Sequence, residues 1–84
     1  MVNSLMDPIT VYTTTWCGSC KRLKSQLQRE GIPFTEVDVE KNDEAATFVL
    51  TANNGALLVP TVKMPDGSAL GNPAVSVIKA RLAA

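Results

Sequence analysis

The only two cysteines of the chain lie in one short segment, Trp16-Cys17-Gly18-Ser19-Cys20, where the sequence changes from a strand-like to a helix-like pattern. Before this segment, Ile9 to Thr14 is a run of β-branched and aromatic residues that predicts a strand. After it, apolar residues recur at helical spacing at Cys20, Leu23 and Leu27. Two cysteines two residues apart at the start of such a helix are typical of a redox-active pair.

Two other uses of a cysteine pair are weak explanations here. A structural zinc site needs four ligands, and the chain has no further cysteine and no histidine, so we expect no metal site. A disulfide that only staples the fold gains stability from the length of the loop that it closes, and this loop has two residues between its cysteines. We therefore expect a bond that is repeatedly made and broken.

Composition and length limit the remaining possibilities. Eight basic residues balance eight acidic ones in 84 residues, so the sequence predicts no binding to nucleic acid or to an anionic membrane. No segment approaches the roughly 20 apolar residues of a membrane span, and the N-terminus has no secretory pattern. A C-x-x-C pair in such a chain is typical of a cytoplasmic protein. We expect a monomer with a flexible tail at residues 1–8 and one domain at residues 9–84.

The rest of the chain alternates between strand and helix signals. Phe34 to Val39 predicts a second strand, parallel to the first because a helix connects them. A second helix is expected after Asn42 or Asp43, with an apolar stripe at Ala45, Phe48, Val49 and Ala52.

The C-terminal third predicts a hairpin and a last helix. A third strand spans Leu57 to Met64 with an interruption at Pro60, and Pro65-Asp66-Gly67 turns the chain into a fourth strand at Ser68 to Leu70. Asn72 is a suitable N-cap for the last helix, with Pro73 in its first position and an inner face at Val75, Ile78 and Leu82. The expected order is βαβαββα.

This order, the C-x-x-C that opens the first helix and the Val59-Pro60 that opens the third strand resemble the thioredoxin fold in its small, glutaredoxin-like form. The resemblance covers Ile9 to Leu82. The segment from Tyr12 to Cys20, Val59-Pro60-Thr61-Val62 and Leu70-Gly71-Asn72-Pro73 are most similar to the mycoredoxins, actinobacterial redoxins that use mycothiol in place of glutathione. The resemblance implies an α/β fold with a four-stranded mixed sheet and three helices.

The positions of the two cysteines on the helix suggest different roles. Cys17 falls at the N-cap or first position, where unpaired amides and the helix dipole favour its thiolate, and we expect solvent to reach it. Cys20 lies one turn further in, on the apolar stripe, so Cys17 should attack and Cys20 should resolve. No carboxylate occurs between Asp7 and Glu30, whereas this interval holds the basic residues Lys21, Arg22, Lys24 and Arg29. These basic side chains either create a positive field that favours an anionic sulfur or simply form the solvated face of the helix.

Besides the two cysteines, Val59-Pro60 is the second candidate part of the active site. The residues alone leave open a trans proline at the start of an edge strand. The resemblance implies instead a cis bond that faces the cysteines and lets the backbone of Val59 pair with an extended substrate. The residues expected to line the substrate groove are Trp16, Gly18, Ser19, Val59, Pro60, Gly71 and Asn72. For Trp16 a place in the core remains open, and for Ser19 an ordinary exposed position; Tyr12 is expected in the core.

Two departures bear on the small thiol. Glutathione-using glutaredoxins usually carry a lysine three residues before the first cysteine and a Gly-Gly followed by an aspartate at the last helix. This chain has Thr14 and Leu70-Gly71-Asn72-Pro73 at those places. Two groups that usually contact glutathione are thus missing, and their absence favours a different small thiol as co-substrate.

The sequence therefore predicts a thiol-disulfide oxidoreductase that reduces mixed disulfides between proteins and a low-molecular-weight thiol, with mycothiol as co-substrate and no tightly bound cofactor. One alternative is a redoxin recharged by a flavoprotein disulfide reductase of the thioredoxin reductase type, serving for instance ribonucleotide reductase. A second is an iron–sulfur carrier, in which Cys17 of two chains and two small thiols hold a cluster. A third is a binding module without catalysis.

Overall fold

The chain follows the expected order of strands and helices. A computed structural model of the protein describes residues 8–83. Its elements are β1 (Ile9–Thr13), α1 (Gly18–Arg29), β2 (Phe34–Asp38), the short 3-10 helix η1 (Val39–Lys41), α2 (Asp43–Ala52), β3 (Thr61–Lys63), β4 (Ala69–Gly71) and α3 (Val75–Ala83). The βαβαββα order is confirmed, with η1 as an addition. The flexible tail expected at residues 1–8 lies outside the described residues apart from Pro8.

The four strands form one mixed sheet in the order β2-β1-β3-β4. β1 is parallel to β2, and the crossover that parallel strands require is made by α1. β3 is antiparallel to both β1 and β4. Because Tyr12 near the end of β1 pairs with Thr61 at the start of β3, the chain leaving β1 towards Cys17 starts beside Pro60. The topology therefore brings together two segments that are more than forty residues apart in the sequence.

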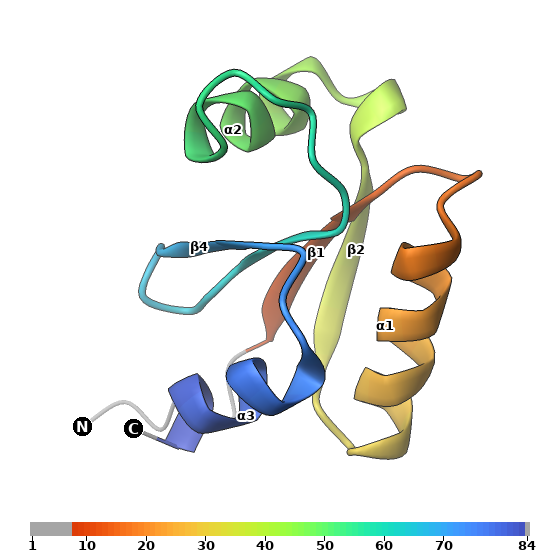
Figure 1. Ribbon diagram of the computed structural model, residues 1–84, viewed down its shortest axis with the longest axis vertical. Helices are drawn as coiled ribbons and strands as arrows, with labels where there is room; N and C mark the ends of the chain where they lie inside the picture. Colours follow the sequence, from red (N-terminus) through yellow and green to blue (C-terminus); the bar gives the residue numbers. More distant parts are fainter. Residues whose placement is uncertain (1–7, 84) are drawn as a thin grey trace.

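Helices cover both faces of this sheet (Figure 1). α1 and α3 enclose the larger core, whose buried members are Ile9, Val11, Leu23, Leu27, Val62, Met64, Ile78 and Leu82. α2 covers the other face over a smaller core of Tyr12, Val39, Ala45 and Val49. A fully buried Leu, Ile or Val contributes about 1.5–3 kcal/mol relative to an exposed one. The apolar stripe predicted for α1 is thus confirmed, and it fixes the cysteine-bearing end of the helix against the sheet.

Local signals gave the start of α2 correctly and the start of α3 wrongly. The side-chain oxygen of Asn42 accepts a hydrogen bond from the Ala45 N–H at 3.0 Å, as expected of an N-cap. Asn72 caps nothing: α3 begins at Val75, and Asn72 has a φ of +46°. Its backbone N–H donates instead to the carbonyl oxygen of Pro60 at 2.7 Å. This tertiary bond holds the segment before α3 against the start of β3.

The expected third strand is also shorter than predicted. Only Thr61–Lys63 pairs with neighbouring strands, whereas Leu57 and Leu58 precede it as an exposed loop. Pro60 has no N–H to donate to a ladder, so pairing starts directly after it. The structure therefore presents residues 57–60 as a loop next to the cysteines.

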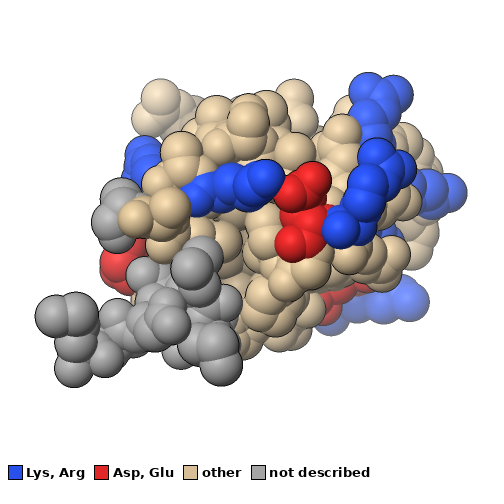
Figure 2. Space-filling view, turned by 90° about the horizontal axis from the view of Figure 1, so that it is seen from below, with Lys and Arg blue, Asp and Glu red and all other residues tan. Residues whose placement is uncertain are grey.

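The charged side chains are mixed. Seen from below, where α3 lies, basic and acidic side chains stand next to one another (Figure 2). Lys79 of α3 forms an ion pair with Glu30, directly after α1, at 2.7 Å. Within residues 8–83 no helix combines the length and the apolar character needed to cross a membrane.

Candidate active site

Cys17 is the N-cap of α1, with an extended backbone at φ −85° and ψ 111°. Its Sγ atom accepts a hydrogen bond from the Cys20 N–H at 3.1 Å. The same sulfur lies 3.8 Å from the carbonyl oxygen of Val59, to which its S–H donates. Cys17 is only 7% exposed, so solvent reaches it less than the sequence suggested. The amide and the positive end of the helix dipole make this sulfur a suitable place for negative charge.

Cys20 lies one turn further along α1 and is completely buried. Burial first, and then its hydrogen bond with Cys17, raise the pKa of its thiol from an ordinary 9.0 to about 12. The positive charge of Lys24 acts in the opposite direction. Both cysteines are free thiols in this structure. The expected division between an outer and an inner sulfur is thus present, with the inner one held as a neutral thiol.

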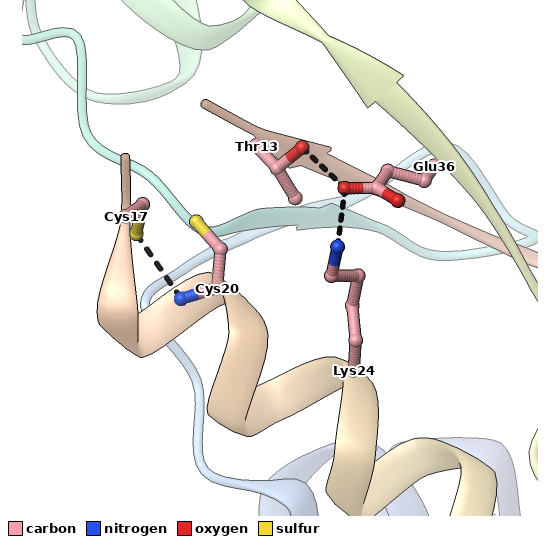
Figure 3. Close-up of polar contacts among 5 residues, drawn as sticks. All are labelled: Thr13, Cys17, Cys20, Lys24 and Glu36. Carbon is pink, nitrogen blue, oxygen red and sulfur yellow. Dashed lines mark hydrogen bonds and ion pairs between the residues drawn. The ribbon is translucent and has the colours of Figure 1, made fainter. Parts of the chain in front are cut away.

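Figure 3 shows Lys24, one turn of α1 beyond Cys20, in a polar group with Thr13 and Glu36 that the sequence did not reveal. Its ammonium group donates to the Glu36 carboxylate at 2.8 Å. The hydroxyl of Thr13, a buried side chain on β1, donates to the same oxygen at 2.8 Å. These two hydrogen bonds, that of Lys24 first, lower the pKa of the Glu36 carboxyl from its ordinary value. The sequence has no carboxylate between Asp7 and Glu30, but the fold brings the carboxylate of Glu36 into contact with this segment.

Val59-Pro60 has the cis bond that the resemblance implied. Pro60 is fully buried, and Val59 is half-buried. The Val59 carbonyl points at Cys17, as the 3.8 Å contact shows, while the Pro60 carbonyl is used by Asn72. No described residue forms a hydrogen bond with the Val59 N–H. One backbone donor beside the nucleophile thus has no partner within residues 8–83.

The two aromatic candidates lie in different environments. Trp16 is 70% exposed, and its indole N–H reaches the Glu40 carboxylate at 3.4 Å. It is therefore not a core residue, and it flanks Cys17 on the side of η1. Tyr12 is buried, as expected, and its ring lies 5.1 Å from that of Phe48. Burial raises the pKa of its hydroxyl.

The two residues between the cysteines are exposed. A Cβ atom on Gly18 would meet nothing within 4 Å, so its absence leaves the first turn open without being required by packing. Within the described residues, the Ser19 hydroxyl makes no hydrogen bond to Cys17. Ser19 instead lines a cavity between α1 and the segment before α3.

Gly71 and Asn72 form the far side of the site. A Cβ atom on Gly71 would lie 2.6 Å from the side-chain oxygen of Asn53 and 2.8 Å from a methyl carbon of Leu58, so glycine is needed for packing here. Asn72 is exposed and lines the same cavity as Ser19. The cysteines, Val59-Pro60 and Asn72 are thus brought together, whereas Gly71 contributes by allowing close contact.

A sheet flanked by helices, a C-x-x-C pair at the first helix and a facing cis-proline define a thiol-disulfide oxidoreductase of the thioredoxin fold. A family model described as Glutaredoxin matches residues 9–67, and the chain belongs to the glutaredoxin family. Membership in this family sets aside a binding module without catalysis.

Individual relatives agree with this assignment. A Mycobacterium tuberculosis protein named "Putative glutaredoxin" is 51% identical over 74 residues, which cover 88% of each chain. Mycoredoxin 1 of Corynebacterium glutamicum is 34% identical over 79 residues, covering 94% of this chain and 98% of that protein. The crystal structure of a glutaredoxin from Methanosarcina mazei matches with a TM-score of 0.74 at 26% identity, covering 89% of this chain and 77% of that one.

Proposed function

We propose that the protein reduces mixed disulfides between proteins and a low-molecular-weight thiol, and that this thiol is mycothiol. The observation that carries the proposal is the asymmetry of the two sulfurs. Cys17 accepts an amide hydrogen bond and is 7% exposed to solvent, whereas Cys20 is completely buried. Such a pair accepts a substrate sulfur at one position only. A disulfide that carries a small thiol on one side suits this restricted access.

The reaction exchanges one disulfide for another. The thiolate of Cys17 attacks the small thiol's sulfur in the mixed disulfide, the S–S bond breaks, and the client protein leaves as a thiolate that takes up a proton. Cys20 then loses its proton and attacks the Cys17 sulfur, which releases the small thiol and leaves a Cys17–Cys20 disulfide. Two electrons have passed to the substrate. Two further molecules of the small thiol return them, forming its own symmetrical disulfide.

The backbone at Val59 supports substrate positioning in this scheme. Its N–H has no partner among the described residues, and its carbonyl already lies beside Cys17. An extended substrate can pair with both groups as an added strand. Positioning through the backbone orients the disulfide without depending on the client's side chains.

The choice of mycothiol rests on the residues that replace the usual glutathione contacts in this chain. Thr14 occupies the position of the usual lysine, and it is uncharged and 4% exposed. Leu70-Gly71-Asn72-Pro73 stands where glutathione enzymes usually have a Gly-Gly followed by an aspartate, and this segment carries no charge. The relative from C. glutamicum carries the name mycoredoxin. An uncharged, hydroxylated thiol fits these residues better than one with two free carboxylates.

A competition between matched substrates tests the proposal. One client peptide is prepared as mixed disulfides with mycothiol and with glutathione, and the rate of peptide release is followed by mass spectrometry. We expect substantially faster release from the mycothiolated peptide and none with Cys17→Ser. Equal or reversed rates would remove mycothiol from the proposal and leave the oxidoreductase activity intact.

A specific observation favours a second candidate, a redoxin recharged directly by a flavoprotein disulfide reductase. Three large apolar side chains are exposed near the cysteines: Trp16 by 70%, Leu57 by 48% and Leu58 by 37%. Trp16 directly precedes Cys17, and the two leucines directly precede Val59, whose carbonyl contacts Cys17. Apolar side chains around a redox site suit a protein partner better than a hydrophilic thiol. NADPH consumption with thioredoxin reductase, compared with the mycothiol system, separates the two candidates. Both functions belong in the cytoplasm, where thiols are kept reduced.

The iron–sulfur alternative is tested separately. Within residues 8–83 no three His, Cys, Asp or Glu side chains are grouped to hold a metal ion. A cluster carried between two chains would need one cysteine from each and two small thiols. Protein purified without oxygen in the presence of the thiol should be colourless and free of iron. Brown protein with iron and sulfide would replace the reductase proposal.

A further inference from the structure

The loop before the facing proline is tied to the end of α2 by a chain of side-chain hydrogen bonds. Asn53 directly follows α2, and its side-chain amide donates to the Val49 carbonyl at 2.8 Å and to the Thr61 hydroxyl at 3.1 Å. The Thr61 hydroxyl in turn donates to the Leu58 carbonyl at 2.5 Å. Thr61 is completely buried. Neither side chain takes part in the chemistry of the two sulfurs, so these bonds need another explanation.

The direction of these hydrogen bonds is set by the Val49 carbonyl. A carbonyl oxygen only accepts, so Asn53 presents the NH2 group of its amide to it. The second N–H of that group points at Thr61, whose hydroxyl oxygen accepts it. The hydroxyl proton is then left for the Leu58 carbonyl. The chain of bonds therefore runs in one sense, from α2 into the loop at residues 57–60.

A held carbonyl at Leu58 determines where the next N–H points. The peptide bond between Leu58 and Val59 is trans, because the one cis bond among the described residues is Val59-Pro60. Within a planar trans peptide unit the C=O and N–H bonds point in opposite directions. Since the Leu58 carbonyl is directed at the Thr61 hydroxyl, the Val59 N–H points away from it, and no described residue accepts from this N–H. The hydroxyl thus fixes the direction of the free donor beside the nucleophile.

The next two peptide units of the loop are held by other contacts. The Val59 carbonyl faces the Cys17 sulfur at 3.8 Å. The Pro60 carbonyl accepts from the Asn72 N–H at 2.7 Å. Among these three units, only the one that carries the Val59 N–H is bonded to Thr61. Loss of the hydroxyl should therefore release this donor and leave the two neighbouring contacts in place.

The surroundings of Asn53 favour this use of its side chain. The turn that ends α2 is closed by backbone groups, since the Gly55 N–H donates to the Leu50 carbonyl at 2.7 Å. On the other side, a Cβ atom on Gly71 would lie 2.6 Å from the side-chain oxygen of Asn53. Gly71 pairs with Thr61 in the sheet. The amide therefore lies close against the strand pair that carries its hydroxyl partner.

We propose that Thr61 and Asn53 are positioning residues that aim the Val59 N–H at a backbone carbonyl of an extended substrate. The inference rests on the function proposed above, in which the backbone of Val59 pairs with the substrate as an added strand. A donor that already points in the bonding direction reduces the freedom that must be lost on binding. The two residues should therefore affect how tightly a peptide binds, while the reactivity of Cys17 stays the same.

The kinetic test compares two symmetrical disulfides in single turnovers of the reduced protein, so that no recharging thiol or reductase is needed. One joins two copies of a five-residue peptide with a central cysteine, and the other is bis(2-hydroxyethyl) disulfide, which has no carbonyl group. Thr61→Val should raise the half-saturating concentration of the peptide disulfide about threefold to tenfold, because one hydrogen bond is lost. The maximal rate, and the reaction of the hydroxyethyl disulfide, should change less than about twofold.

Two further substitutions show whether the hydroxyl acts through its hydrogen bonds. Thr61→Ser keeps the hydroxyl and should bind the peptide disulfide within about twofold of the parent protein. Asn53→Ala lets the hydroxyl turn away from the Leu58 carbonyl and should weaken binding less than Thr61→Val does. The double variant should be no worse than Thr61→Val alone, because both changes act on one carbonyl. Additive losses would remove Asn53 from the inference, and a Thr61→Ser protein as weak as Thr61→Val would overturn it.

Asn42→Ala serves as the matched control. Asn42 lies at the other end of α2, and its side chain also bonds to the backbone, accepting from the Ala45 N–H. Its loss weakens the same helix without touching the loop, and chemical denaturation measures the stability of every variant. An equal loss of peptide binding in Asn42→Ala, or equal losses for both disulfides in Thr61→Val, would show a merely structural role and overturn the inference.

A binding experiment separates this inference from the proposed function. The same peptide with serine in place of cysteine is titrated into the reduced, 15N-labelled protein, so that no exchange takes place. We expect a saturable downfield shift of the Val59 amide proton, retained in Thr61→Ser and weakened in Thr61→Val. This result would support the positioning role even if mycothiolated and glutathionylated peptides reacted at equal rates. A Val59 amide proton that does not shift, or that shifts equally in all three proteins, would reject the role whatever thiol the reductase prefers.

Discussion

The Sγ atom of Cys17 accepts a hydrogen bond from the backbone N–H of Cys20 at 3.1 Å, while the side chain of Cys20 is completely buried. One residue thus supplies both a fixed donor that steadies the attacking sulfur and the second sulfur that later displaces the substrate. The backbone group acts from the start of the reaction, and the side chain acts only once its proton has left.

The first prediction follows from this relationship. Cys17→Ser should abolish every exchange reaction, because the remaining thiol has no access to substrate. Cys20→Ser should still reduce small mixed disulfides and should accumulate a mixed disulfide on Cys17, measured by mass spectrometry. Equal alkylation rates of the two thiols in the reduced protein would contradict these roles.

The second prediction concerns stability at alkaline pH. Because the pKa of Cys20 is raised from 9.0 to about 12, the unfolded chain releases this proton at lower pH than the folded one. The stabilisation from the neutral buried thiol is fully present below pH 9 and is lost as the pH rises towards 12. The free energy of unfolding of the reduced protein should therefore fall in this window more steeply than that of Cys20→Ala. Parallel curves for the two proteins would show that Cys20 is not the titrating group.

The third prediction assigns Lys24 a positioning role towards Cys20. Its charge lowers the pKa of that thiol, so Lys24→Gln should raise this pKa further and slow the release of the small thiol by Cys20. The reaction of Cys17 alone, measured in a Cys20→Ser background, should not change. Lys79→Gln removes a comparable ion pair far from the sulfurs and serves as control. A loss of equal size in the presence and absence of Cys20 would mean that Lys24 acts elsewhere.

The fourth prediction contrasts two glycines. Gly71→Ala would place a Cβ atom 2.6 Å from Asn53 and 2.8 Å from Leu58, and should lower the free energy of unfolding by about 1–3 kcal/mol. Gly18→Ala adds a methyl group into open space at the start of α1 and should be neutral or stabilising by up to about 1 kcal/mol. Chemical denaturation measures both. Similar losses in both variants would show that the contact at Gly71 is not the cause.

The fold was largely predictable because its signals are local. The spacing of Cys20, Leu23 and Leu27 marked the buried face of α1, and all three side chains are buried. The Asn42 cap was equally readable, since a side chain three residues from its partner decides it. The family resemblance supplied the cis bond at Val59-Pro60, for which the local sequence carries no decisive signal.

The errors and omissions concern contacts between distant segments. Asn72 and Pro73 matched the start of a helix, but the bond from Asn72 to Pro60 outweighed that local preference and moved the helix start to Val75. The contact of Lys24 with Glu36 needed the register of two parallel strands. In that register Glu36 pairs with Val11, so its side chain lies on the face of the sheet that α1 covers. A polar residue at this position of β2 could therefore have predicted a partner on α1.

Burial of Cys20 also decides where oxidative damage begins. A peroxide approaching through solvent meets only the sulfur of Cys17, and its first product would be a sulfenic acid at that position. The neutral thiol of Cys20, one helical turn away, can condense with it to a disulfide and release water before further oxygen is added. The burial that raises the pKa of Cys20 thus also keeps this thiol available to protect Cys17 from irreversible oxidation.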